Sequence, residues 1–154
     1  MLKKHLNKRI AIFKKKKKMK ILQDIWILTN SGIVLFNRVF DKTMKTQLFG
    51  ALMSALNSFA EKLAEGGLTN FELSDKKFVI MKKSDLLYVA NASKTAKEKK
   101  VVEQLSIVSE KFISLYPPEW LKKEWDNDVS VFEVFVNHIE DAIEDPVKKF
   151  WEGF

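Results

Sequence analysis

The stretch IWILTNSGIVLF, residues 25–36, decides how the rest of the chain can fold. Its two apolar runs are separated by Thr29, Asn30, Ser31 and Gly32, which favour a tight turn. Apolar runs on both sides of such a turn are typical of a β-hairpin. We therefore expect residues 21–40 to form two antiparallel strands.

A long amphipathic helix is predicted directly after this hairpin. Asp41 and Thr43 are candidate N-cap residues, and Gly66 and Gly67 end the segment. Apolar residues recur between these limits at spacings of three and four, which is the period of a helix. They are Met44, Leu48, Leu52, Ala55, Leu56, Phe59 and Leu63.

Three short strand-like runs follow the glycines, at residues 68–73, 78–81 and 86–90. The polar breaks between them, residues 74–77 and 82–85, are rich in the residues that form tight turns. This pattern predicts a meander of three strands.

The remaining chain reads as helical. A helix is expected from about Thr95 to Tyr116, where two prolines end it, with a short helical turn at residues 119–125. Its apolar side is formed by Val101, Val102, Leu105, Val108, Phe112 and Leu115. A last helix is expected to be capped by Asp128, or by Ser130 with Glu133, and to carry an apolar stripe of Phe132, Phe135, Val136, Ile139 and Ile143.

Aromatic residues concentrate in this last part of the chain. They are expected to seal the C-terminal helices onto the sheet, and a partner surface is the alternative. They are Trp120, Trp125, Phe132, Phe135, Phe150, Trp151 and Phe154.

The predicted order of elements is ββαβββαα, an α+β fold. This order, carried by IWILTNSGIVLF, QLFGALMSALNSFAEKLAEGG and FELSDKKFVIMKKSDLLYVANAS, resembles the longin-like (SNARE-like) fold, which is related to the roadblock family. The resemblance covers Ile21 to about Phe150. It implies a five-stranded antiparallel sheet with the first helix on one face and C-terminal helices packed against the fold.

The resemblance also implies a function. Domains of this kind pair with one another and bind or regulate small Ras-superfamily GTPases in membrane traffic and signalling. The chain would then be a non-catalytic interaction module forming a homodimer or heterodimer, with a roadblock-type scaffold as the alternative. An apolar sheet edge, at residues 33–40 or 68–73, is expected to invite pairing. We expect part of the GTPase contact at four positions of the first helix, against the alternative that this face is only solvated. They are Lys45, Gln47, Ser54 and Glu61.

The sequence lacks the residues that most catalytic or cofactor sites need. The chain has no cysteine, and its five glycines fit neither a phosphate loop nor a dinucleotide fingerprint. His138 with Glu133, Asp141 or Glu144 reads better as a solvated acidic face than as a metal site. We therefore expect no enzyme activity, no cofactor and no metal.

Positive charge is concentrated at the start of the chain. The net charge is +7, yet residues 1–20 carry 10 of the 27 Lys and Arg and no acid. Residues 21–154 hold 17 basic and 20 acidic residues, a net charge of −3. We therefore divide the chain into a basic tail, residues 1–20, and a domain, residues 21–154.

The tail is predicted to bind an anionic membrane. Four apolar residues share one side of a short helix, and the lysines that follow would attract anionic lipid. The predicted contacts are Leu2, Leu6, Ile10, Phe13, Lys14, Lys15, Lys16, Lys17 and Lys18. The alternatives are a nucleic-acid tract, which the acidic domain argues against, and a solubilising tail, which includes a native start at Met19. The expected location is the cytoplasm, with peripheral membrane association.

Overall fold

The computed structural model describes residues 21–40, 43 and 45–140. An antiparallel hairpin of β1 (Asp24–Thr29) and β2 (Val34–Arg38) is followed by helix α2 (Thr46–Leu63). The strands β3 (Asn70–Glu72), β4 (Lys76–Lys83) and β5 (Leu86–Ser93) come next. The described chain then ends with α3 (Glu98–Leu115), the short α4 (Pro118–Lys123) and a 3₁₀ helix, η1 (Val129–His138). The expected α+β fold is confirmed.

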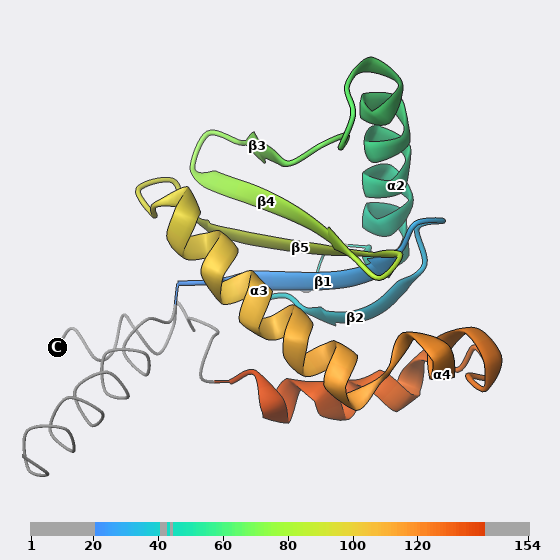
Figure 1. Ribbon diagram of the computed structural model, residues 1–154. Coiled ribbons are helices and arrows are strands. Elements are labelled where there is room, and N and C mark those ends of the chain that lie inside the picture. Colours follow the sequence, from blue (N-terminus) through green and yellow to red (C-terminus); the bar gives the residue numbers. More distant parts are fainter. Residues whose placement is uncertain (1–20, 41–42, 44, 141–154) are drawn as a thin grey trace, which may run out of the picture.

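All five strands form one antiparallel sheet in the order β2-β1-β5-β4-β3 (Figure 1). The first hairpin joins the meander through β1 and β5, in a register that places Asp24 opposite Asn91. Strands β2 and β3 are therefore the two edges; the sequence analysis expected an edge at residues 33–40 or 68–73, and both segments hold one. Helix η1 packs beside β2, where the ring of Phe135 meets the ring of Phe36 edge-on at 5.1 Å.

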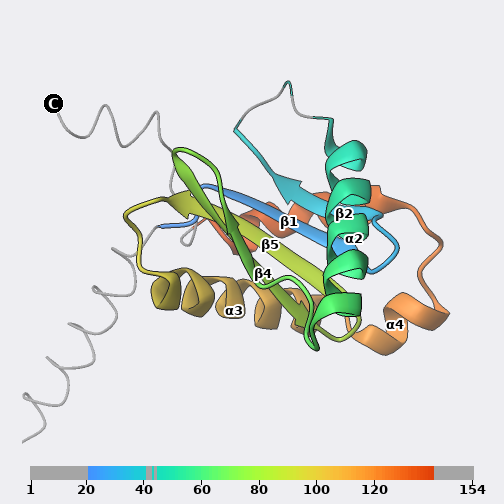
Figure 2. The same ribbon diagram turned by 90° about the horizontal axis from the view of Figure 1, so that it is seen from above.

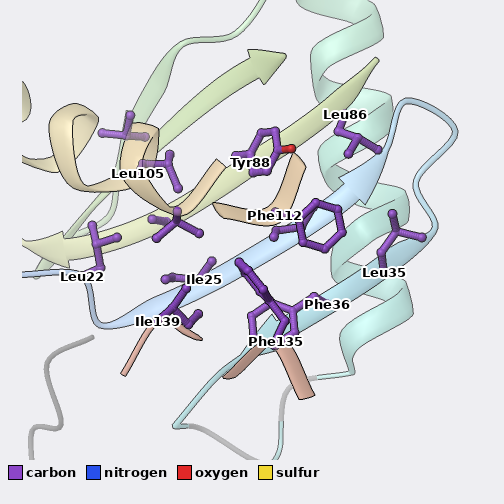
Figure 3. Packing of buried hydrophobic residues seen from close by; sticks show 14 of the residues in the cluster. Leu22, Ile25, Leu35, Phe36, Leu86, Tyr88, Leu105, Phe112, Phe135 and Ile139 are labelled. Atoms are coloured by element: carbon purple, nitrogen blue, oxygen red, sulfur yellow. The ribbon is translucent and has the colours of Figure 1, made fainter. Parts of the chain in front are cut away.

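Alternating residues of β1, β4 and β5 belong to two separate cores on opposite faces of the sheet. Ile25 and Ile27 of β1 belong to the larger core. Figure 3 shows Ile25 on the same side of the sheet as Tyr88 of β5, Phe112 of α3 and Phe135 of η1. On the opposite face, beside α2, a smaller cluster contains Trp26, Leu28, Val34, Met53, Phe78, Ile80, Leu87 and Val89. Successive side chains of a strand point to opposite faces of a sheet. Since neighbouring residues of these strands are both apolar, each face carries buried apolar side chains. In Figure 2, α2 crosses over the strands, whereas α3 lies to one side of them.

The C-terminal part differs from the sequence prediction in one respect. The segment from Val129 to His138 is a 3₁₀ helix, although an α-helix was expected. Phe132 and Phe135, three residues apart, are both buried, and a repeat of three residues per turn places them on one side. The predicted cap is confirmed, because Asp128 Oδ1 accepts a hydrogen bond from the Ser130 amide at 3.0 Å.

The aromatic residues of the described C-terminal part seal it onto the sheet. Phe132 and Phe135 are fully buried, and Trp120 and Trp125 pack against the same cluster. Phe150, Trp151, Phe154 and Ile143 lie outside the described residues. Within the part of the chain that the structure covers, no helix is both long and apolar enough to span a bilayer.

Candidate partner-binding surface on helix α2

Helix α2 attaches to the hairpin through small and polar side chains. Gln47 holds both backbone groups of Val34: its Oε1 accepts from the Val34 amide at 3.1 Å, and its Nε2 donates to the Val34 carbonyl at 3.3 Å. Two turns further, Ser54 Oγ donates to the carbonyl of Asn30 at 2.6 Å. The side of the helix that faces the hairpin thus satisfies backbone polar groups in and beside the turn between β1 and β2.

Gly50 lies between these two contacts and lets the backbones approach closely. A Cβ at this position would collide with the carbonyl oxygen of Gly32 and would lie 2.6 Å from Cγ2 of Val34. Gly32 itself has a positive φ of 95°, which its place in the turn requires. Helix α2 can therefore sit this close to the turn only because position 50 has no side chain.

The second half of α2 is fixed by a polar cluster. Asn57 is buried; its Nδ2 donates to Glu61 Oε1 at 3.1 Å, and its Oδ1 accepts from the Leu68 amide at 3.4 Å. Lys82 Nζ lies 3.0 Å from the same Glu61 oxygen and also donates to the Gly66 carbonyl. The hydrogen bond from Lys82, then the hydrogen bond from Asn57 and the charge of Lys82, lower the pKa of Glu61. This cluster ties the end of α2 to β4 and to the loop that follows the helix.

The opposite side of α2 is apolar and exposed. We name it the outer stripe, and its members are Leu48 (67% exposed), Leu52 (53%), Leu56 (41%), Phe59 (64%) and Leu63 (74%). At about 100° per residue these five fall within an arc of roughly 80°, centred about 130° from the buried side of Gly50, Met53 and Asn57. Ala55 is exposed beside them.

Helix α3 shows the usual arrangement by contrast. Its residues Val101, Leu105, Val108 and Phe112 are fully buried against the sheet. An amphipathic helix normally turns its apolar side to the core in this way. Because α2 instead exposes five large apolar side chains in a continuous row, the outer stripe has the character of a surface that binds another protein.

The four predicted contact residues of α2 lie beside or behind this stripe. Gln47 and Ser54 face the hairpin, and Glu61 faces Lys82, so all three make contacts within the chain. Lys45 is exposed and precedes the first turn of the helix. Lys45, Gln47 and Glu61 are exposed and Ser54 is half-buried, and the GTPase contact at these four positions stays a prediction. The structure adds that the outer stripe of α2 is exposed as well. The spacing of the apolar residues in the sequence shows that the stripe exists, but it does not show whether the stripe faces the sheet or the solvent.

The N-cap prediction for this helix is wrong. The N-cap residue is Lys45, and it makes no side-chain capping bond. Thr43 lies two residues before it, and Asp41 and Met44 lie outside the described residues. The nine predicted membrane contacts of the tail lie outside them as well; they are Leu2, Leu6, Ile10, Phe13, Lys14, Lys15, Lys16, Lys17 and Lys18.

Three further features of the described chain bear on a functional site: its possible metal ligands, the contacts of His138 and a hollow beside α4. No group of three His, Asp or Glu among them is placed to hold a metal ion. His138 stacks near Phe135, with ring centres 6.3 Å apart, and its carbonyl accepts from Lys111 Nζ at 3.0 Å. A hollow of about 160 Å³ between the hairpin end and α4 is lined mainly by Leu35, Leu86, Leu121 and Trp125, with the Asp85–Lys122 ion pair (3.3 Å) at its rim.

Solved structures that are similar to this chain include roadblock and MglB proteins. The roadblock/LC7 domain from Streptomyces avermitilis is 15% identical over 64% of this chain and 88% of its own, with a TM-score of 0.53. MglB from Myxococcus xanthus is 12% identical over 66% and 84%, with a TM-score of 0.48. The gliding protein MglB from Thermus thermophilus is 14% identical over 60% and 76%, with a TM-score of 0.41. At these identities the roadblock domain shows a likeness of fold only.

Sequence comparison assigns the family. No curated protein matches the chain. The family model described as the first longin domain of FUZ, MON1 and HPS1 matches residues 23–125, from the start of β1 to just beyond α4. Because this match spans well over half of the 154 residues, the chain belongs to the family of the first longin domain of FUZ, MON1 and HPS1.

Proposed function

We propose that this protein is a non-catalytic interaction module that pairs with a second copy through the outer stripe of α2, and that binds a small Ras-superfamily GTPase. The observation that carries the pairing is the exposure of five large apolar side chains on one side of α2. Burying such a row removes apolar surface from water, which is the main driving force of association.

The spacing of the stripe favours a second copy as the occupant. Leu48 and Leu63 are equally far from a point between Ala55 and Leu56, and so are Leu52 and Phe59. Two copies of α2 that run antiparallel about a two-fold axis at this point would place Leu48 against Leu63 of the partner subunit. They would also place Leu52 against Phe59 of the partner subunit. A two-fold interface requires this kind of self-complementary surface.

The GTPase is a separate part of the proposal. Its support is membership of a longin family, together with the function that the longin resemblance implies. Part of this contact would involve Lys45 at the N-cap of α2 and Gln47, Ser54 and Glu61 within the helix, all outside the outer stripe. As an exchange factor the domain would have to favour the open, nucleotide-free GTPase, whereas an effector would prefer one nucleotide state.

Cysteine cross-linking tests the pairing directly, because the chain has no cysteine of its own. The Ala55→Cys variant carries its thiol next to the proposed axis, so mild oxidation should convert it to a disulfide-linked dimer. The matched control is Ser58→Cys, an exposed position on the same helix but off the stripe. Equal cross-linking of both variants would mean random collision and would contradict the proposal.

The mass in solution provides the second measurement. Light scattering should show a dimer for the full chain and a monomer for the Leu52→Glu, Phe59→Glu double variant, with unchanged helix content by circular dichroism. Leu73→Glu, which alters an exposed leucine outside α2, should leave the dimer intact. A monomer for the unaltered chain at about 100 µM would exclude self-pairing.

GTPase binding needs its own assay, which can fail while pairing holds. Fluorescent nucleotide release from GTPases of the same genome is measured with and without the full chain, alongside direct binding. Faster release indicates an exchange factor, and binding without faster release indicates an effector or scaffold. No binding to any of them in either nucleotide state or in the nucleotide-free state would remove the GTPase from the proposal.

A further inference from the structure

A group of lysines occupies the connection between β5 and α3. Four of the seven residues from 94 to 100 are lysines, and Glu98 is the only acid among them. All four lysines are exposed. Lys100 pairs with Glu103 at 3.6 Å, whereas Lys94, Lys97 and Lys99 form no ion pair with any residue that the structure describes. Within the described part of the chain, three positive charges at this place on the surface are thus not opposed by an ion pair.

The start of β4 supports this connection. Lys76 lies opposite Ser93 in the sheet, and Lys77 Nζ donates to the Ala96 carbonyl at 3.5 Å. The charges of these two lysines are opposed by Asp24 at 3.8 Å and Glu72 at 3.9 Å. Lys76 and Lys77 therefore help to fix the connection between β5 and α3, and their own charges are largely neutralised by these acids.

The basic tail joins the domain at the same end. Asp24 is the register partner of Asn91; Ile21 lies three residues before the first, and Lys94 lies three residues after the second. In Figures 1 and 2 the start of β1 and the start of α3 lie together at the end of the sheet away from α2. The 20 residues before Ile21 contain ten basic residues and no acid. Lys94 and the start of α3 are thus close to Ile21, where the basic tail joins the domain.

We propose that Lys94, Lys97 and Lys99 form a docking surface for an anionic lipid bilayer, close to the point where the basic tail joins the domain, and that this docking leaves α2 free. Attraction to anionic lipid requires basic residues within a Debye length of the surface. A bilayer bound to these three lysines would lie close to Ile21, so the charges of the tail could add to the binding. The three lysines would fix the orientation of the domain on the bilayer.

The composition of the tail and the net charge of the domain favour lipid over nucleic acid as the partner. The tail interleaves its bases with Leu2, Leu6, Ile10 and Phe13, apolar side chains that a bilayer can accept and a phosphate backbone cannot. The domain as a whole has a net charge of −3. A long polyanion that followed the protein surface would meet these acids, whereas a bilayer would touch only the basic end.

Vesicle sedimentation of the full chain tests the proposal. Vesicles of phosphatidylcholine with about 30% phosphatidylserine should bind the protein, and pure phosphatidylcholine vesicles should bind it weakly. Each lysine held near the anionic surface is expected to contribute about five-fold to the partition coefficient. The Lys94→Gln, Lys97→Gln, Lys99→Gln triple variant should therefore bind at least ten-fold more weakly, and each single variant should show part of that loss.

A charge-matched control separates position from net charge. The Lys83→Gln, Lys122→Gln, Lys123→Gln variant removes three lysines at the other end of β4 and from α4. It should bind within about two-fold of the unaltered chain, because these lysines lie away from the membrane end. Equal losses in the two triple variants would overturn the docking surface and leave only a net-charge effect.

Two further outcomes would also overturn it. In the first, the unaltered chain does not sediment with phosphatidylserine vesicles. In the second, the Lys94, Lys97 and Lys99 changes abolish binding to a short DNA duplex but leave vesicle binding intact, which would make this a nucleic-acid surface. Neither outcome bears on pairing through α2, which is measured by cross-linking and mass.

Discussion

Gly50 of helix α2 lies directly against Gly32 in the turn between β1 and β2, with no room for a side chain between them. This contact sets the rotation of α2, because only the side of the helix that carries Gly50 can approach the turn. Gln47 and Ser54 lie on the same side and hydrogen-bond to the hairpin backbone. The apolar outer stripe is consequently turned away from the sheet.

Gly50 should tolerate even a single methyl group poorly. Alanine at an exposed helix position is more favourable than glycine by about 1 kcal/mol. At position 50 the added Cβ would force the helix away from the turn, so Gly50→Ala should lower the free energy of unfolding by about 1–3 kcal/mol. Urea unfolding measures the change. Ser58→Ala on the exposed side should be neutral or slightly stabilising, and a stabilised Gly50→Ala would mean that the helix is not held this closely.

A buried carboxylate joins the sheet to the segment after β2. Asp24 Oδ1 accepts from the Phe40 amide and Oδ2 accepts from Asn91 Nδ2, both at 2.9 Å, while Lys76 lies 3.8 Å away. Asp24→Ala leaves these two donors without a partner, so we expect a loss of about 3 kcal/mol in unfolding free energy. Lys76→Gln should cost less than about 1 kcal/mol because the lysine is partly exposed. Equal losses would show that the ion pair, and not the hydrogen bonds, stabilises this site.

The hydroxyl of Tyr88 is buried without a hydrogen-bond partner among the described residues, and burial raises the pKa of Tyr88. Tyr88→Phe should therefore leave the unfolding free energy at neutral pH unchanged or raise it by about 1 kcal/mol. The control is Tyr116→Phe, which loses the hydrogen bond to the Val131 carbonyl (3.1 Å) and should cost about 1 kcal/mol.

The same tyrosine predicts a pH dependence. Because the folded pKa of Tyr88 is raised, its contribution to stability is complete below the unfolded pKa, near 10, and is lost as the pH rises above it. The unaltered chain should lose about 1.4 kcal/mol more per pH unit than Tyr88→Phe once the pH exceeds about 10. Chemical unfolding at a series of pH values measures this difference. Parallel curves for the two proteins would mean that Tyr88 ionises as easily in the folded state.

The lowered pKa of Glu61 predicts local opening at low pH. Its contacts with Lys82 and Asn57 are present above the unfolded pKa of about 4.5 and are lost as the pH falls through the folded value. Glu61→Gln should remove this dependence and speed hydrogen exchange of the Leu68 amide, which bonds to Asn57. Glu65→Gln changes a nearby acid that makes no ion pair with the described residues and should leave that exchange unchanged.

Much of the fold follows from local sequence patterns. The turn at Asn30 to Gly32 has the chemistry of a hairpin, and the polar breaks around residues 75 and 84 produce the meander. In helix α3, the repeat from Val101 to Phe112 predicts both the helix and its buried side. These features depend on neighbours in the chain, so the sequence alone is sufficient to predict them.

The candidate site depends on a different kind of information. The sequence determined that α2 is a helix with one apolar side, and it determined the basic composition of the first 20 residues. Only the tertiary structure decided which side of α2 faces outward, because the shape and polar groups of the turn at Gly32 select Gly50, Gln47 and Ser54 as the side that meets the hairpin. Likewise, only the sheet register brings Lys94 close to the start of β1. A periodic pattern shows that the two sides of an element differ, whereas the surface that it meets determines which side is buried.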